Sequence, residues 1–337
     1  MSSSIWLLFQ GALVFRPSRK IIRAVLLCVI VFLVIGGLHF LGFQPQAKPE
    51  LPPDEVDRSE FAYAQYATDE PYLCNSLMIF TSLKAHNVNA DLLLMYPDTF
   101  NLSEDTRPGR LLAIAKSLGV KLQPVPVQRF EGGDSTWAES FTKLLAVNQT
   151  QYKRVLHWDS DATVLDSMDE LFLLPPSPVA MPRAYWLEGH NLSSQLILIE
   201  PSAREFERIL VAFQHRGPGD YDMEIVNKLY GDNCIILAHR AYDLLSGMLY
   251  GREGDHARYL GSQAEAWDVE RVLDQAKYLH FSDWPVPKPW LPQTDELMEA
   301  QAPKCNVSGT PNDCRDREKW LWLYCDFHSR RQQVCPD

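Results

Sequence analysis

The stretch that most constrains the fold is residues 152–172, where a strand-like segment runs directly into Asp159-Ser160-Asp161. Residues 154–158 predict a β-strand. Two carboxylates two positions apart on an extended backbone point to the same side, so both would stand at the rim of a sheet. A divalent cation would relieve their mutual repulsion. On spacing alone a turn rich in Asp and Ser is the more frequent outcome, so a metal site needs support from the rest of the chain.

Strand and helix patterns alternate up to that stretch. The expected strands are 61–67, 91–96, 120–127 and 154–158, and the expected helices are 69–86, 107–118 and 137–147. This alternation predicts an α/β domain with a mostly parallel central sheet flanked by helices. Later strands are expected at 178–182, 195–200, 234–237 and 278–281, and helices at 202–213 and 223–230. Ligands of such sheets bind at the carboxyl ends of the strands, where Asp159 and Asp161 fall.

The N-terminus predicts a membrane anchor. Residues 24–43 contain no Asp, Glu, Lys or Arg, and are long enough to cross a bilayer as a helix. Residues 1–23 carry basic but no acidic side chains, whereas residues 44–60 are rich in acid and proline. The positive-inside rule therefore gives a cytosolic tail, a signal anchor, a stem and a lumenal remainder. The alternative is a cleaved signal peptide, but the apolar run is long and no small-x-small cleavage site follows it.

Glycosylation acceptors and cysteines agree with a lumenal location. Four Asn-x-Ser/Thr sites begin at Asn101, Asn148, Asn191 and Asn306. Six cysteines follow the anchor without a Cys-x-x-Cys spacing, which favours disulfides over zinc in an oxidising compartment. Four of them lie at positions 305, 314, 325 and 335, so we expect a disulfide-stapled C-terminal tail over residues 298–337, after a catalytic domain over 61–297. The net charge of −11 argues against a nucleic-acid partner.

Several segments together resemble one enzyme family. They include YATDEPYLCNSLMIF, WDSDATVLDSMDELF, SSQLILIEPS, YDMEIVNKLYGD and HFSDWPVPKPW, and they cover most of residues 61–327. Combined with the expected topology, the chain resembles a Golgi type II glycosyltransferase of the GT-A fold, in family 8. Within that family it is most similar to the fungal alpha-N-acetylglucosaminyltransferases, which are often labelled glucose N-acetyltransferases.

The resemblance implies a metal site for a sugar nucleotide. Asp159, Asp161 and His280 match the family's metal ligands, and a mixed oxygen and imidazole set suits Mn²⁺ better than Mg²⁺. The alternative for His280 is a buried histidine at a strand end. Lys288 matches the lysine that holds the donor phosphate, although more residues separate it from His280 than is usual. Asp283 or Trp284 stands where the family has a glycine.

The resemblance also implies contacts to the nucleotide and donor. Tyr66, Thr68 and Asp69 match the corner that binds the uracil and ribose of UDP, although a strand-to-helix turn capped by Asp69 would also explain them. Lys143 matches a helical lysine that points toward the donor, with an exposed lysine as the alternative. Ser160 would face away from the two carboxylates, leaving backbone near it to contact the ribose.

Two residues are candidates for the chemistry itself. Asp222 occupies the position of a family carboxylate near the reacting sugar carbon or the acceptor, and Asp220 is its competitor. Gln195 stands beside the expected donor sugar, where the family usually has a glycine. Met223 replaces the family's usual glutamine.

The expected function is therefore retaining, metal-dependent transfer of a sugar in the Golgi membrane. The expected donor is UDP-GlcNAc, the cofactor Mn²⁺ or another divalent cation, and the acceptor a mannose-containing glycan or glycoprotein. One alternative is the same fold acting on UDP-glucose or UDP-galactose. Another is a non-catalytic lumenal glycan-binding homologue. No P-loop, dinucleotide glycine motif or Ser-His-Asp arrangement suggests a different enzyme class.

Overall fold

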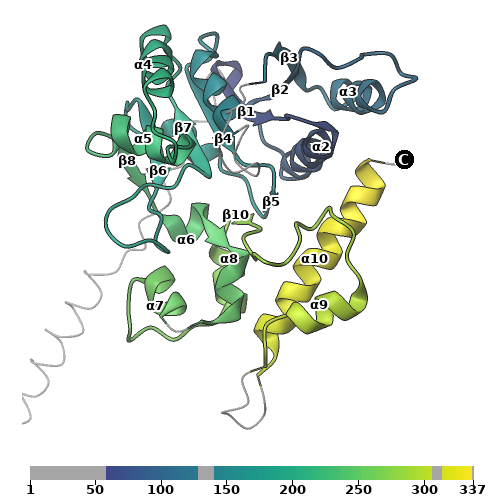
Figure 1. Cartoon of the computed structure of the whole chain (residues 1–337), viewed down its shortest axis with the longest axis vertical. Coiled ribbons are helices and arrows are strands. Elements are labelled where there is room, and N and C mark those ends of the chain that lie inside the picture. Colours follow the sequence, from purple (N-terminus) through teal and green to yellow (C-terminus); the bar gives the residue numbers. More distant parts are fainter. Residues whose placement is uncertain (1–57, 128–139, 253, 306–312, 336–337) are drawn as a thin grey trace, which may run out of the picture. The chain divides into compact units, whose positions relative to one another are not determined.

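The computed structural model describes residues 58–127, 140–252, 254–305 and 313–335 (Figure 1). The expected cytosolic tail, the signal anchor and nearly all of the stem lie outside these residues, as does the glycosylation site at Asn306. Within the described ranges, no helix combines the length and the apolar character needed to cross a bilayer.

A seven-stranded sheet organises the described chain, in the order β3-β2-β1-β4-β7-β6-β8. The strands β1 (Phe61–Tyr66), β2 (Asp91–Pro97), β3 (Lys121–Val125) and β4 (Arg154–Trp158) are parallel. Beyond them β7 (Leu196–Ile199) is antiparallel to β4, β6 (Val179–Pro182) is antiparallel to β7, and β8 (Ile235–Leu237) is parallel to β6. The prediction of a mostly parallel central sheet is confirmed.

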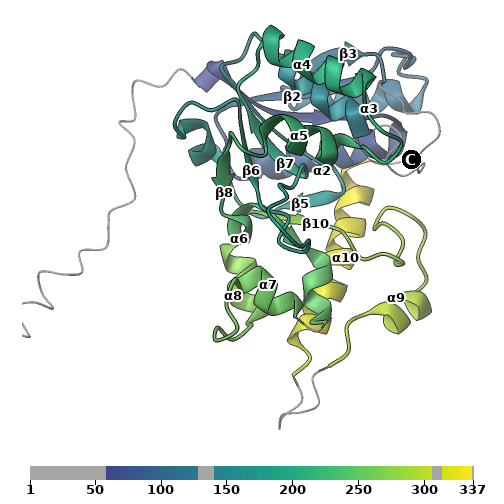
Figure 2. The ribbon, with the colours of Figure 1, turned by 60° about the vertical axis from the view of Figure 1, so that its left-hand side comes forward.

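Helices cover both faces of this sheet, as predicted (Figures 1 and 2). Alternate residues of a strand point to opposite faces, and in β1 Tyr63 packs with α2 (Glu70–Ala85) and α3 (Arg107–Ser117), whereas Ala64 packs with α4 (Ala203–Gln214) and α5 (Asp222–Tyr230). Each fully buried leucine or phenylalanine in these two cores contributes about 1.5–3 kcal/mol. The two cores therefore fix the sheet from both sides.

The expected helix over 137–147 differs from the structure. Its described part is a 3-10 helix, η2 (Ser140–Asn148), and residues 137–139 lie outside the description. Most described side chains of η2 are buried, including the polar Thr142 and Lys143. Tertiary packing therefore overrides the helical pattern here, and the tighter turn brings Lys143 into the interior.

A smaller sheet lies next to the central one, in the order β5-β10-β9. Its strands are β5 (Ala162–Val164), β10 (Tyr278–His280) and β9 (Leu244–Leu245), with β10 antiparallel to β5 and parallel to β9. The chain passes from β4 to β5 through Asp159-Ser160-Asp161, so the acidic stretch is the junction of the two sheets. The remaining short elements are η1 (Arg58–Glu60), η3 (Asp169–Leu173), α6 (His239–Tyr242), η4 (Ser246–Tyr250), α7 (Asp255–Leu260) and α8 (Val269–Gln275).

The C-terminal segment is helical, with α9 (Asp295–Gln301) followed by α10 (Arg315–Val334). Trp320, Leu323 and Phe327 of α10 are buried in the same core as α2. These residues follow the i, i+3, i+7 spacing of a helix that buries one face. The segment is therefore an integral part of the domain rather than an appended tail.

Two disulfides hold the C-terminal segment, one within it and one to the main domain. Cys305 pairs with Cys314, but Cys335 pairs with Cys74 of α2, and Cys325 has no disulfide. Ten residues of helix separate Cys325 from Cys335, about 15 Å along the axis and too far for a bond. The Cys74–Cys335 bond instead fastens the end of α10 to the main domain. Cys234 is likewise free.

Candidate active site

The acidic stretch is held by backbone hydrogen bonds on both sides. The amide of Asp159 donates to the carbonyl of Gln195 at the start of β7, at 2.9 Å, and the amide of Phe281 after β10 donates to the carbonyl of Asp161, also at 2.9 Å. Both contacts lie at the carboxyl end of β4, where α/β sheets bind their ligands. The two carboxylates are thus fixed at the junction of the two sheets.

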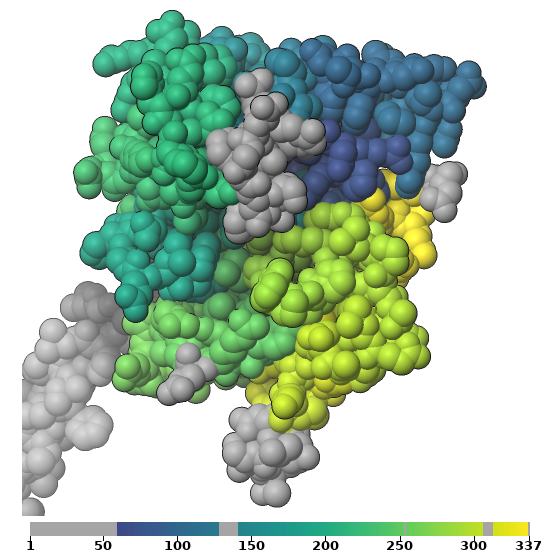
Figure 3. Space-filling view, viewed as in Figure 1, coloured from purple at the N-terminus to yellow at the C-terminus, as the bar shows by residue number. Residues whose placement is uncertain are grey.

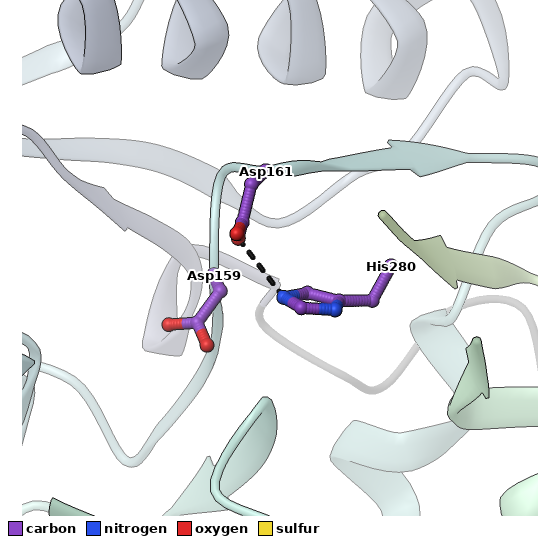
Figure 4. Close-up of side chains that lie close together, drawn as sticks. All are labelled: Asp159, Asp161 and His280. Carbon is purple, nitrogen blue, oxygen red and sulfur yellow. Dashed lines mark ion pairs between the residues drawn. The ribbon is translucent and has the colours of Figure 1, made fainter. Parts of the chain in front are cut away.

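Asp159, Asp161 and His280 converge on one point (Figure 4). One ligand atom of each lies within 4.8 Å of the others, and His280 Nε2 is 3.1 Å from Asp161 Oδ1. The other ring nitrogen of His280, Nδ1, is buried without a hydrogen bond from the described residues. Two carboxylates and an imidazole suit a first-row divalent cation such as Mn²⁺, so the residues present fit the expected metal.

Lys288 reaches this cluster from the loop after β10. Its Nζ lies 2.6 Å from Asp161 Oδ2 and 2.6 Å from the carbonyl oxygen of Phe281. Burial alone would raise the pKa of Asp161, but His280 and Lys288 outweigh it and hold that pKa well below its usual range. Asp161 is therefore ionised, and the Lys288 ammonium places a positive charge beside the proposed metal position.

A second set of charges lies on the other side of Asp159. Lys143 Nζ lies 2.9 Å from Asp159 Oδ1 and 2.7 Å from Asp222 Oδ2. Only 3% of the Lys143 side chain is exposed, and burial would lower its pKa, yet the two carboxylates raise that pKa. The pKa of Asp159 is raised, because burial outweighs the opposing effect of Lys143. Lys143 thus joins a proposed metal ligand to a proposed catalytic carboxylate.

The structure separates Asp222 from its competitor. The hydroxyl of Ser194 donates to Asp222 Oδ2 at 2.5 Å, on the same oxygen that Lys143 contacts. Asp220 instead accepts from the amide of Gly217 at 2.7 Å and pairs with the exposed Lys228. Of the two carboxylates, Asp222 is the one that belongs to the buried cluster.

The proposed nucleotide corner lies at the end of β1. The Tyr66 hydroxyl donates to Asp159 Oδ1 at 3.4 Å, and its ring stacks on His157 with centroids 5.3 Å apart. Asp69 caps α2 by accepting the Tyr72 amide at 2.9 Å. Thr68 precedes Asp69 in the same turn. Ser160 is buried between the two metal-binding candidates.

Gln195 lies beside Asp159. Its carbonyl accepts the Asp159 amide and, at 3.5 Å, the Tyr278 hydroxyl. Its side-chain oxygen Oε1 is buried without a hydrogen bond from the described residues. A buried amide oxygen of this kind is costly unless a ligand or water meets it, so Gln195 has unused hydrogen-bonding capacity within the site.

Three nearby polar residues were not predicted from the sequence. Ser194 binds Asp222, as described above. Asp243 is fully buried before β9, and burial, reinforced by the charge of Asp159, raises its pKa well above the usual range. Asp283 is a buried residue of the loop that carries Lys288. No local pattern in the sequence around Asp243 indicates that its carboxyl is buried.

Solved structures share this fold. The glycosyltransferase GlyE of Streptococcus pneumoniae TIGR4 has a TM-score of 0.53 at 17% identity, over 81% of this chain and 62% of GlyE. The galactosyltransferase LgtC, solved with donor and acceptor sugar analogues, has a TM-score of 0.51 at 15% identity, over 79% of this chain and 95% of LgtC. At these identities the likeness shows the fold alone, which is that of the GT-A glycosyltransferases.

Curated relatives are much more similar in sequence, although no family model matches the chain. A protein of Gibberella zeae named Glucose N-acetyltransferase 1 is 52% identical over 83% of this chain, and the match spans 63% of that protein's length. Its namesake in Aspergillus fumigatus is 41% identical over 95% of this chain and 88% of its own length. The chain therefore belongs to the glucose N-acetyltransferase 1 family.

Proposed function

We propose that the protein is a metal-dependent glycosyltransferase that moves a sugar from a UDP-sugar onto a glycan. The observation that carries this proposal is the convergence of Asp159, Asp161 and His280, which come from two different sheets. Lys288 also contacts the Asp161 carboxylate. The finer proposal is retaining transfer of GlcNAc from UDP-GlcNAc to a mannose-containing glycan. It draws on the resemblance of the site segments to the fungal N-acetylglucosaminyltransferases.

The residues around Asp161 would act on the leaving group. A divalent cation, when bound by Asp159, Asp161 and His280, neutralises the diphosphate as it departs. Lys288, held by Asp161, adds a fixed positive charge where negative charge develops on the UDP oxygens. Because the Lys288 ammonium is already positioned by two contacts, little reorganisation is needed when the leaving group forms.

The residues beyond Asp159 would act on the sugar. Lys143 and Ser194 orient the Asp222 carboxylate, which would face the reacting sugar carbon or the acceptor hydroxyl. The Gln195 amide offers a further hydrogen bond to the donor sugar. In this proposal Lys288 acts on the phosphates of the leaving UDP, whereas Asp222 and Gln195 act on the sugar.

A lumenal Golgi location is proposed on the sequence of residues 1–60. The apolar run 24–43, the basic tail before it and the acidic stem after it favour a single-pass type II protein. The two described disulfides are consistent with an oxidising compartment.

A donor screen tests the proposed activity. The full-length protein in detergent would be incubated with Mn²⁺ and UDP-GlcNAc, UDP-glucose or UDP-galactose, and released UDP would be measured. Acetyl-CoA is a further arm, because the relatives' name specifies acetyl transfer. We expect turnover with UDP-GlcNAc that is lost on chelation and in Asp161→Ala, but kept in the matched control Asp220→Asn.

Two results would reject this function. One is the absence of turnover with every UDP-sugar, and the other is undiminished turnover in Asp161→Ala. Calorimetry then decides whether the protein is a binding homologue, because such a protein would bind glycan without Mn²⁺-dependent binding of UDP.

A further inference from the structure

An exposed tryptophan lies in the loop between two residues of the proposed active site. The side chain of Trp284 is 85% exposed, the most of any large hydrophobic residue in the described ranges. It stands between His280, at the end of β10, and Lys288, which contacts Asp161. The hydrophobic effect opposes the exposure of an indole ring to water. An exposed tryptophan beside the proposed active site therefore indicates a surface that binds a ligand.

The loop is fixed on the N-terminal side of Trp284. The Asp283 carboxylate is buried and accepts hydrogen bonds from the Ser246 hydroxyl at 2.5 Å and the Tyr324 hydroxyl at 2.8 Å. The amide of Val286 donates to the carbonyl of Asp283 at 2.7 Å, which closes a tight turn around Trp284 and Pro285. The turn is therefore tied to η4 and α10 immediately before the tryptophan.

The loop is also fixed on the C-terminal side. Lys288 is bound to Asp161, and the Trp290 ring packs on Tyr72 of α2 and Phe327 of α10, with centroids 5.4 Å and 6.2 Å apart. Figure 3 shows this yellow-green part of the chain at the surface beside the purple elements that follow residue 58. Trp284 is thus presented from a loop with anchors on both sides.

We propose that Trp284 is a stacking platform for a sugar ring of the acceptor glycan, an inference that rests on the proposed function. One face of a pyranose is lined with C–H groups and lies flat on an aromatic ring, while its hydroxyls stay in water. The acceptor has to approach the donor site, and the loop from His280 to Lys288 forms part of that site.

The exposed area fits a sugar better than a protein partner. One indole beside the exposed Pro285 covers about the area of a single ring, whereas a stable protein interface buries about 800 Å² on each side. The second exposed tryptophan of the described chain, Trp322, lies 53% exposed on α10 and is not part of this loop. It provides a matched control.

The test measures acceptor binding apart from catalysis. Full-length protein in detergent, saturated with Mn²⁺ and UDP, would be titrated calorimetrically with an α-linked mannotetraose. We expect Trp284→Ala to weaken mannotetraose binding about tenfold and Trp284→Phe by only about two- to threefold, since an aromatic contact is worth about 0.5–1.5 kcal/mol. Trp322→Ala should bind as the wild type does, and all four proteins should bind UDP equally.

Three outcomes would overturn the assignment. They are equal mannotetraose affinity in Trp284→Ala and wild type, no mannotetraose binding by the wild type, or a change of sedimentation coefficient in Trp284→Ala, which would assign the tryptophan to an interface between copies. UDP release from UDP-GlcNAc without acceptor tests the proposed function separately. If the wild type releases UDP while the Trp284 variants bind mannotetraose normally, only the further inference fails.

Discussion

Lys143→Met should be among the most destabilising single substitutions in the charged cluster. It removes a cation that contacts both Asp159 and Asp222, at 2.9 Å and 2.7 Å, from a side chain that is 3% exposed. Opposite charges about 4 Å apart interact by about 4 kcal/mol at an effective dielectric of about 20. Removing one member of a buried pair costs about 3–5 kcal/mol, because the remaining charge has lost its partner.

The assay is thermal unfolding of the full-length protein in chelator, followed by circular dichroism. A loss of about 3–5 kcal/mol corresponds to a fall in Tm of about 6–20 °C for a domain of this size class. Lys228→Met is the matched control, because Lys228 is an exposed lysine paired with Asp220, and it should leave Tm almost unchanged. The double variant Lys143→Met/Asp222→Asn should recover part of the lost stability, because it lowers the negative charge left in the buried cluster.

The reasoning is refuted if Lys143→Met unfolds within about 1 kcal/mol of the wild type, below the range for a buried pair. It is equally refuted if the Lys228 control is just as destabilised. Added Mn²⁺ should partly restore the Tm of Lys143→Met, because a cation at the proposed metal site would offset the charge of Asp159.

Three further predictions concern other parts of the domain. Cys335→Ser should lower the free energy of unfolding by about 2–5 kcal/mol, and Cys325→Ser should not, a contrast that denaturant unfolding can measure. Wild-type stability should fall as pH rises from about 4 through the raised folded pKa of Asp243, because the folded state holds a proton that the unfolded chain has released. Asp243→Asn should remove this fall in stability with rising pH. An unchanged pH dependence in the variant would show that Asp243 does not cause it. Gln195→Ala should lower kcat about 10²-fold with UDP binding unchanged, as for loss of one transition-state contact; a wild-type kcat would remove Gln195 from the chemistry.

Local patterns were sufficient to predict the first half of the sheet. The parallel strands β1, β2 and β4 are mostly apolar runs, whereas β3 (KLQPV) is largely exposed, and Asp69 marks the start of α2 by capping it. The alternation also favours β1, β2 and β3 as neighbours, because a helix between parallel strands usually places them side by side, but it does not show that β4 pairs with β1 rather than with β3. The carboxyl end of β4 could therefore be located before any coordinates were known.

The parts that were missed depend on contacts between distant residues. Lys288 and Asp161 are 127 positions apart, and no local pattern shows that their side chains meet. The same holds for Cys74 and Cys335, which are 261 positions apart. The helix α10 is different, because the apolar spacing around Phe327 would have indicated it from the sequence.

Only part of the candidate site could be predicted, because some of its contacts also join residues that are distant in the sequence. The resemblance identified the residues of the metal cluster, and the structure brings them together. The link from Lys143 to Asp222 could not be predicted, since it joins residues 79 positions apart in the sequence. Asp243 went unnoticed because a lone carboxylate in sequence shows neither its burial nor its neighbours.

Anomalous diffraction from crystals grown with Mn²⁺ and UDP tests the central claim most directly. We predict a manganese peak within about 2.0–2.6 Å of one oxygen each of Asp159 and Asp161, with His280 Nε2 as a further ligand. Lys288 should then contact a UDP phosphate oxygen from its place beside Asp161. A structure with UDP bound, no manganese at this position and Asp161 still paired with His280 and Lys288 would contradict the proposed metal site.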